Sequence, residues 1–208
     1  MDDINKHAII FATRFEARDF KPPPDVILFY SGMGKKKVKN CLEKLLKKCR
    51  PHCIVNSGFA GGLNPDLSEG AIVYRTTEGD DSFFRSSGAF AARFFCSNEV
   101  VTSVEEKRAL FLKTGADVVD MESDVIFNVC CENKIPCYII RVVSDGANTA
   151  MPVDFNNIFH ILCGVVKILT VSEYRNEAKE FRRKMYVSAK ILGEYLDCFF
   201  AHHAHNRK

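Results

Sequence analysis

Two acids at the end of an apolar segment are the first residues whose types and spacing could do chemistry. In the stretch ADVVDMES (116–123), Asp120 and Glu122 flank Met121 at the end of a predicted buried strand. Acidic side chains are almost never fully buried unless they are paired or hydrogen-bonded. The pattern therefore indicates either a strand end that is exposed to water or a site that holds a polar ligand.

Three further polar points follow predicted strands in the same way. Glu16 comes just after the first strand, the stretch NSGFAGG (56–62) comes after the third, and Ser144 and Asp145 end the last one. Taken singly, each is as well explained by a loop acid, a turn or a helix cap. Because ligands of α/β proteins bind outside the carboxyl ends of the strands, the four points together predict one ligand site at that edge.

The elements that must position these residues are short apolar runs that alternate with helical patterns. This alternation indicates an α/β fold with a largely parallel sheet, in a single domain that spans residues 1–208. The predicted strands cover residues 7–13, 25–32, 52–58, 71–77, 116–121 and 137–144.

Helical spacing is clearest from Lys35 to Cys49, where the apolar residues fall on one face and the lysines on the other. The lysines could form a nucleic-acid patch, but a solvated surface is the simpler explanation. Further helices are predicted over 103–113, 123–133 and most of the chain after Val153, with a C-terminal helix over 172–201. We expect the histidine-rich tail, 202–208, to be disordered rather than to bind a metal.

The overall composition is that of an ordinary globular protein. The formal net charge of the 208 residues is +3, which is too small to argue for nucleic acid or an anionic membrane as a partner. The first residues do not have the pattern of a signal peptide, and the longest nearly apolar run, 159–171, is shorter than the roughly 20 residues that span a bilayer. Nine cysteines without a CxxC pair favour buried, reduced thiols, so we expect a cytoplasmic protein.

Three motifs in a fixed order carry a resemblance to a known family. NSGFAGGL, VVDMES and IPCYIIRVVSD resemble the nucleosidase and purine nucleoside phosphorylase superfamily. Among its functional types the chain is most similar to 5′-methylthioadenosine/S-adenosylhomocysteine nucleosidase, with features of the hopanoid-associated phosphorylase branch. The resemblance extends from about Ala8 to Asn148 and weakens over 76–95. It implies a three-layer α/β/α sandwich with a central mixed, mostly parallel sheet.

The resemblance also implies a role for each acid. Glu122 would accept hydrogen bonds from the ribose hydroxyls, since a carboxylate offers acceptors to two neighbouring groups, and Met121 would pack against the sugar. Asp145 would donate a proton to the purine N7 as the glycosidic bond breaks, a kind of help worth about 10²–10⁴-fold. Glu16 would orient and deprotonate the attacking water.

Other substrate contacts come from the same motifs. The resemblance places Phe59, Ala60, Gly61, Ser144 and Asp120 at the substrate. Phe59 stands where the nucleosidases usually carry a serine, and Asp120 stands where a glutamate is common. No cofactor or metal is implied, and the family suggests a homodimer.

The activity expected from these residues is hydrolysis of a purine nucleoside, with adenine as the base. Phosphorolysis stays open as an alternative. Related phosphorylases hold phosphate with an arginine and a serine where this chain has Asn56 and Phe59, although Arg14, Arg18 or Arg75 could supply charge from elsewhere. A nucleoside-binding protein without turnover also stays open. Dinucleotide binding through SGMG (31–34) is disfavoured, because the third spaced glycine is missing.

Overall fold

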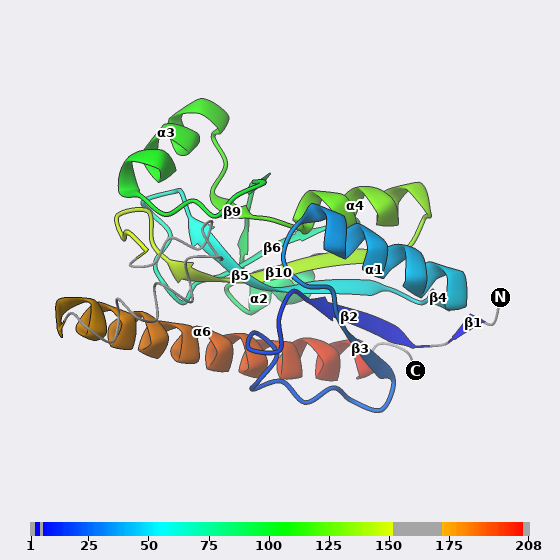
Figure 1. Ribbon diagram of the computed structural model, residues 1–208. Helices are drawn as coiled ribbons and strands as arrows, with labels where there is room; N and C mark the ends of the chain where they lie inside the picture. Colours follow the sequence, from blue (N-terminus) through cyan, green and yellow to red (C-terminus); the bar gives the residue numbers. More distant parts are fainter. Residues whose placement is uncertain (1–2, 5, 152–171, 206–208) are drawn as a thin grey trace.

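The computed structural model describes residues 3–4, 6–151 and 172–205, and its centre is a mixed sheet (Figure 1). Along the sheet the strands follow the order β3-β2-β5-β10-β6-β7, while β9 pairs with both β5 and β8. The bounds are β2 His7–Phe11, β3 Val26–Tyr30, β5 Ile54–Gly62, β6 Ile72–Thr76, β7 Phe90–Ala91, β8 Phe94–Cys96, β9 Val118–Asp120 and β10 Cys137–Asp145. Strands β1 (Asp3–Ile4) and β4 (Arg50–Pro51) form a separate parallel pair.

The central strands run parallel, so that their carboxyl ends meet at one edge. The pairs β3–β2, β2–β5 and β5–β10 are parallel, whereas β6 on β10 and β9 on β5 are antiparallel. The predicted mixed and mostly parallel sheet is therefore confirmed.

Helices cover the two faces of this sheet. Helices α1 (Lys35–Lys48) and α4 (Ser123–Glu132) lie on one face, and α2 (Ser82–Ser86) and α6 (Ser172–His205) lie on the other (Figure 1). Helix α3 (Val104–Thr114) stands at the end of the molecule, near the carboxyl ends of β5 and β10. The predicted three-layer arrangement is confirmed.

Strand β2 shows why a continuous apolar run forms a central strand. Side chains alternate across the sheet, so Ala8 and Ile10 pack under α1 and α4, while Ile9 and Phe11 pack against α6. All four are at most 1% exposed.

The predicted strands are found within a few residues of their expected bounds, with one informative difference. The sequence indicated a strand that ends at 58 and a glycine-rich turn beyond it, but β5 continues to Gly62. The added residues are held in the sheet because Gly61 and Gly62 pair with Val119 and Val118 of β9. The short elements α2, β7 and β8 were not predicted.

The C-terminal helix is longer than the sequence indicated. We expected it to end at 201 and a disordered tail to follow, but α6 continues through His202 and His203 to His205. The His203 ring lies 4.0 Å from that of Phe199, centroid to centroid, and aromatic packing of this kind holds the last turn. Residues 153–171, where helix was also predicted, and 206–208 lie outside the described residues.

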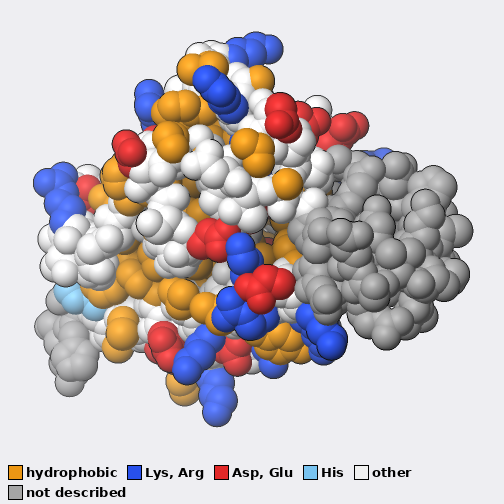
Figure 2. All heavy atoms as spheres, turned by 90° about the vertical axis from the view of Figure 1, so that its left-hand side faces the viewer, with side chains coloured by type: hydrophobic (Ala, Val, Ile, Leu, Met, Phe, Trp, Pro, Cys, Tyr) orange, Lys and Arg blue, Asp and Glu red, His pale blue; other side chains and the backbone are white. Residues whose placement is uncertain are grey.

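Figure 2 shows the end of the molecule where α3 and the first turns of α6 lie. Acidic and basic side chains are mixed on this face, with hydrophobic side chains exposed between them. None of the helices in the described part of the chain is long and apolar enough to cross a membrane.

Candidate active site

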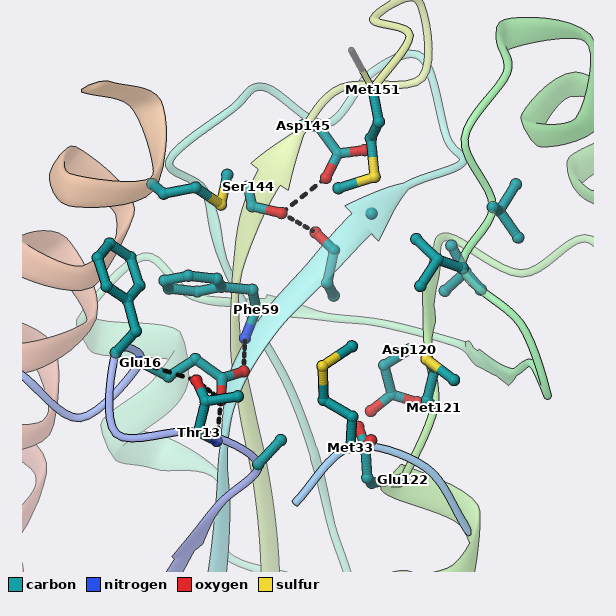
Figure 3. Close-up of a pocket in the computed structure, with 18 of the residues that line it drawn as sticks. Thr13, Glu16, Met33, Phe59, Asp120, Met121, Glu122, Ser144, Asp145 and Met151 are labelled. Atoms are coloured by element: carbon teal, nitrogen blue, oxygen red, sulfur yellow. Dashed lines mark hydrogen bonds between the residues drawn. The ribbon is translucent and has the colours of Figure 1, made fainter. Parts of the chain in front are cut away.

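The predicted site residues line one pocket at the carboxyl ends of β5, β9 and β10. The pocket has a volume of about 320 Å³, which is within the range that holds a small ligand. It is lined by Ala12, Thr13, Phe15, Glu16, Met33, Phe59, Ala60, Gly61, Glu99, Val100, Val101, Val119, Asp120, Met121, Glu122, Ser144, Asp145, Met151, Phe181 and Met185. Figure 3 shows Glu16 and Glu122 on opposite sides of the pocket and Asp145 at a third corner.

Glu16 is fixed by hydrogen bonds to both of its carboxylate oxygens. Thr13 donates to Oε2 from its backbone N–H at 2.6 Å and from its hydroxyl at 2.9 Å, and the Phe59 N–H donates to Oε1 at 3.2 Å. Burial raises the pKa of Glu16, although these hydrogen bonds act in the opposite direction. A carboxylate with a raised pKa and a fixed orientation suits a general base.

A glycine makes room for this carboxylate. A Cβ at position 58 would lie 2.5 Å from Glu16 Oε1, and Gly58 has a φ of +156°. The glycine that the sequence placed in a turn therefore lets strand β5 approach the acid closely.

Glu122 lies at the start of helix α4, directly after β9. Its Oε1 accepts a hydrogen bond of 2.5 Å from the backbone N–H of Gly34, and the residue is 8% exposed. Burial raises the pKa of Glu122 to about 7, and the negative charge of Asp120 adds to this effect. Met121 and Met33 lie beside Glu122 at the pocket (Figure 3).

Asp120 faces the pocket, but its oxygens are already engaged by the protein. Arg141 Nη2 donates to Oδ2 at 2.8 Å, and the Ser123 hydroxyl donates to Oδ1 at 2.6 Å. Arg141 is buried within strand β10 and also donates to the backbone carbonyl and the side-chain oxygen of Asn56. In this network the buried negative charge of Asp120 and the buried positive charge of Arg141 compensate each other.

Asp145 ends strand β10 and is 3% exposed. The Ser144 hydroxyl lies 2.6 Å from Oδ1, and the Lys107 ammonium donates to Oδ2 at 2.5 Å. Gly61 passes directly beneath this carboxylate, because a Cβ at that position would lie 3.4 Å from Asp145 Oδ2. The backbone carbonyl of Ala60 also lies within hydrogen-bond distance of the Ser144 hydroxyl, at 3.3 Å.

The rest of the pocket wall is apolar. The rings of Phe15 and Phe59 lie edge to face, with centroids 6.3 Å apart, and Phe181 and Met185 of α6 complete this side. Phe59, which replaces the serine common in the nucleosidases, therefore forms wall while its backbone N–H holds Glu16.

The charge of the pocket is one-sided. Five acidic side chains line it, and no Lys, Arg or His does so among the residues that the structure describes. The arginines considered from sequence lie elsewhere. Arg75 pairs with Asp124 at 2.9 Å, Arg14 lies over the ring of Tyr30, and Arg18 lies over that of Tyr186.

All the predicted site residues line the pocket, but several residues that support them were missed. Arg141 could have been found, since an arginine inside a predicted buried strand signals a buried partner. Neither Thr13 nor Lys107 gave a clear signal in the sequence. Within the described ranges, no group of three His, Cys, Asp or Glu side chains is arranged as metal ligands.

The family to which this α/β fold belongs is shown by comparison with a family model. The model of the phosphorylase superfamily matches residues 23–91 and 89–160. The chain belongs to this superfamily.

The most similar curated relatives include two kinds of nucleosidase. Aminodeoxyfutalosine nucleosidase of Campylobacter jejuni is 24% identical over 166 residues, which cover 64% of this chain and 72% of the relative. A 5′-methylthioadenosine/S-adenosylhomocysteine nucleosidase of Shewanella pealeana is 29% identical over 168 residues, which cover 64% and 73%.

Solved structures share the fold over almost the whole chain. The 5′-methylthioadenosine/S-adenosylhomocysteine nucleosidase of Campylobacter jejuni superimposes with a TM-score of 0.64 at 18% identity, over 92% of this chain and 96% of that one. The Arabidopsis thaliana 5′-methylthioadenosine nucleosidase gives a TM-score of 0.68 at 13% identity, over 96% of each chain.

Proposed function

We propose that this protein hydrolyses the N-glycosidic bond of a purine nucleoside, with adenine as the base. The observation that carries the proposal is the placement of Glu16, Glu122 and Asp145 around one pocket. Carboxyl groups of this kind suit the steps of the reaction, and the curated relatives are nucleosidases.

The three acids divide the work of bond cleavage. Glu122 accepts hydrogen bonds from the ribose hydroxyls, and Glu16 holds a water molecule and takes its proton. The water oxygen bonds to C1′ while the C1′–N9 bond breaks. The electron pair of the broken C1′–N9 bond stays on the purine. Asp145, in its protonated form, gives its proton to N7, so that the base leaves as a neutral molecule. The negative charges also stabilise the positive sugar in the transition state.

Water is favoured over phosphate as the nucleophile by the charge of the pocket. Phosphate is held in proteins by arginine or by other charge-assisted donors. Described residues that line this pocket supply five acids and no cation, and Arg141 beneath it is engaged by Asp120 and Asn56. Glu16 would repel an anion but can activate a neutral water.

The apolar side of the pocket supports a nucleoside with an apolar group on the ribose 5′ carbon. Phe15, Phe59, Phe181 and Met185 offer a wall that a charged or fully hydrated group would not fill well. One substrate in the relatives' names fits this class, since 5′-methylthioadenosine carries a methylthio group, whereas S-adenosylhomocysteine carries a charged amino acid there. Asp120 is paired with Arg141, so it would support the residues beside the substrate and would not hydrogen-bond to the sugar itself.

We further propose a cytoplasmic location and a homodimer. All eight cysteines in the described part of the chain are free thiols, which fits a reducing compartment. Light scattering of the purified protein tests the homodimer.

The proposed activity is tested with a panel of nucleosides. The protein is incubated with 5′-methylthioadenosine, S-adenosylhomocysteine, adenosine and inosine, and free base is measured by chromatography. We expect adenine from at least one adenine nucleoside, with the highest rate for a 5′-modified one. Binding of these nucleosides without release of any base would support a nucleoside-binding protein and contradict the proposal.

A further inference from the structure

Lys107 is a buried lysine in a helix whose other residues are not buried. Its side chain is 0% exposed, and it is the one buried residue of α3. It sits in the first turn of that helix, where the positive end of the helix dipole disfavours a cation. Burying an ammonium is costly unless it is paired and fully hydrogen-bonded. The buried ammonium of Lys107 is therefore expected to have a negatively charged partner.

The ammonium uses all three of its donors on one short segment. It donates to Asp145 Oδ2 at 2.5 Å, to the carbonyl of Gly146 at 2.8 Å and to that of Thr149 at 2.7 Å. The other carboxylate oxygen of Asp145 lies 2.6 Å from the Ser144 hydroxyl. Lys107 therefore fixes the orientation of the carboxyl group as well as its charge environment.

The surroundings make this cation important for proton donation. When Asp145 gives up its proton it becomes a carboxylate in a pocket that already holds Glu16, Asp120 and Glu122. Like charges in a buried site oppose the formation of another one. Lys107 is the cation in contact with Asp145 among the described residues, so it stabilises the carboxylate that the reaction leaves behind.

We propose that Lys107 is a positioning residue for catalysis, which fixes the Asp145 carboxyl group at the pocket and stabilises its ionised form after proton transfer. This inference rests on the proposed function, in which Asp145 is the general acid. It goes beyond that function because it assigns to Lys107 of helix α3 a part in proton donation by Asp145.

Glu69 offers a matched control on the same loop. Its Oε1 accepts from the Gly146 N–H at 3.3 Å and from the Thr149 hydroxyl at 2.9 Å, so it holds the same segment without touching Asp145. If Lys107 served only to hold the loop, Glu69→Gln would have the same kinetic effect as Lys107→Met.

The test compares two leaving groups. Lys107→Met is expected to lower kcat for adenine release by about 10- to 100-fold with little change in KM, because part of the general acid contribution is lost. Cleavage of 4-nitrophenyl β-ribofuranoside, whose leaving group departs without a proton, should change less than about threefold, since no general acid is needed. Equal losses on both substrates, or losses equal to those of Glu69→Gln, would overturn the inference.

Two further measurements keep the test decisive. In an Asp145→Asn background, Lys107→Met should have little additional effect on kcat, whereas independent effects would contradict action through Asp145. If Lys107→Met does not fold, Lys107→Gln takes its place. If the wild-type protein releases no base, the proposed function fails, and a crystal structure of the Lys107 variant still tests the positioning. Asp145 is expected to turn from its place, and an unchanged carboxylate would overturn the inference.

Discussion

Asp145 is the residue on which the proposed chemistry depends most. It is buried at the end of β10, where a lysine and a serine contact its two carboxyl oxygens at the edge of the pocket. Asp145→Asn should keep the fold and nucleoside binding but lower kcat by about 10²-fold or more, because the amide cannot act as the acid. Adenine release measures kcat, and calorimetry with the nucleoside measures binding. The exposed Asp66→Asn is the control, and turnover within a few-fold of wild type would exclude Asp145 as the acid.

Glu122 should make nucleoside binding depend on pH. Its pKa is raised to about 7 by burial, so the ligand-free protein favours the protonated form more than the unfolded chain does. This group therefore supports folding below its unfolded pKa and loses that contribution as the pH rises through about 7. The ribose hydroxyls need the ionised form, so binding should weaken as the pH falls below about 7.

Glu122→Gln tests this account with calorimetry across pH. The loss of a charged acceptor should cost roughly 1.5–3 kcal/mol for ribosides at high pH and remove the pH dependence near 7. Analogues without the 2′ or 3′ hydroxyl should lose less. An equal loss for ribosides and deoxy analogues would show that Glu122 does not read the sugar.

At the scale of elements, strand β5 matters because its glycines let two acids lie against the backbone. Gly58→Ala would place a Cβ 2.5 Å from Glu16 Oε1, so the carboxylate must move. We expect a fold that survives, a strain of about 1–3 kcal/mol, and a loss of turnover because the water is no longer oriented.

Gly88→Ala is the matched control for that variant. Gly88 has a φ of +76° with open space around it, so its replacement brings backbone strain without touching the pocket. Thermal unfolding should show a loss of stability in both variants, and adenine release should fall only in Gly58→Ala. An equal loss of activity in both would mean that Gly58 acts through stability alone.

The elements show what the sequence could and could not predict. Central strands such as β2 and β10 were found because continuous apolar runs are required where both faces are covered. The continuation of β5 was missed, because glycines resemble a turn until β9 is seen to pair with them. The last turn of α6 was missed as well, since its histidines pack on Phe83 of α2 in addition to Phe199 of their own helix.

At the scale of the whole molecule, the fold brings together residues that are far apart in the chain. Glu16 and Asp145 meet because β2 and β10 run parallel to β5 and end at the same edge of the sheet, which was predictable from strand ends alone. Glu122 reaches the same edge directly after β9, which runs antiparallel to β5. The link from Lys107 to Asp145 was not predictable, because the packing of α3 against that edge has no signature in its helical spacing. The acids could be read from sequence, and Arg141 could have been, whereas the contact between Lys107 and Asp145 required the structure.

The central claim is that water, and not phosphate, is the nucleophile that displaces the purine from the sugar. The most direct measurement is the identity of the sugar product when 5′-methylthioadenosine or adenosine is incubated with the protein, with and without phosphate. We predict free adenine and free sugar in phosphate-free buffer, at a rate that phosphate does not increase, because five acids and no described cation line the pocket. A strict requirement for phosphate, with a sugar 1-phosphate as the product, would contradict the account.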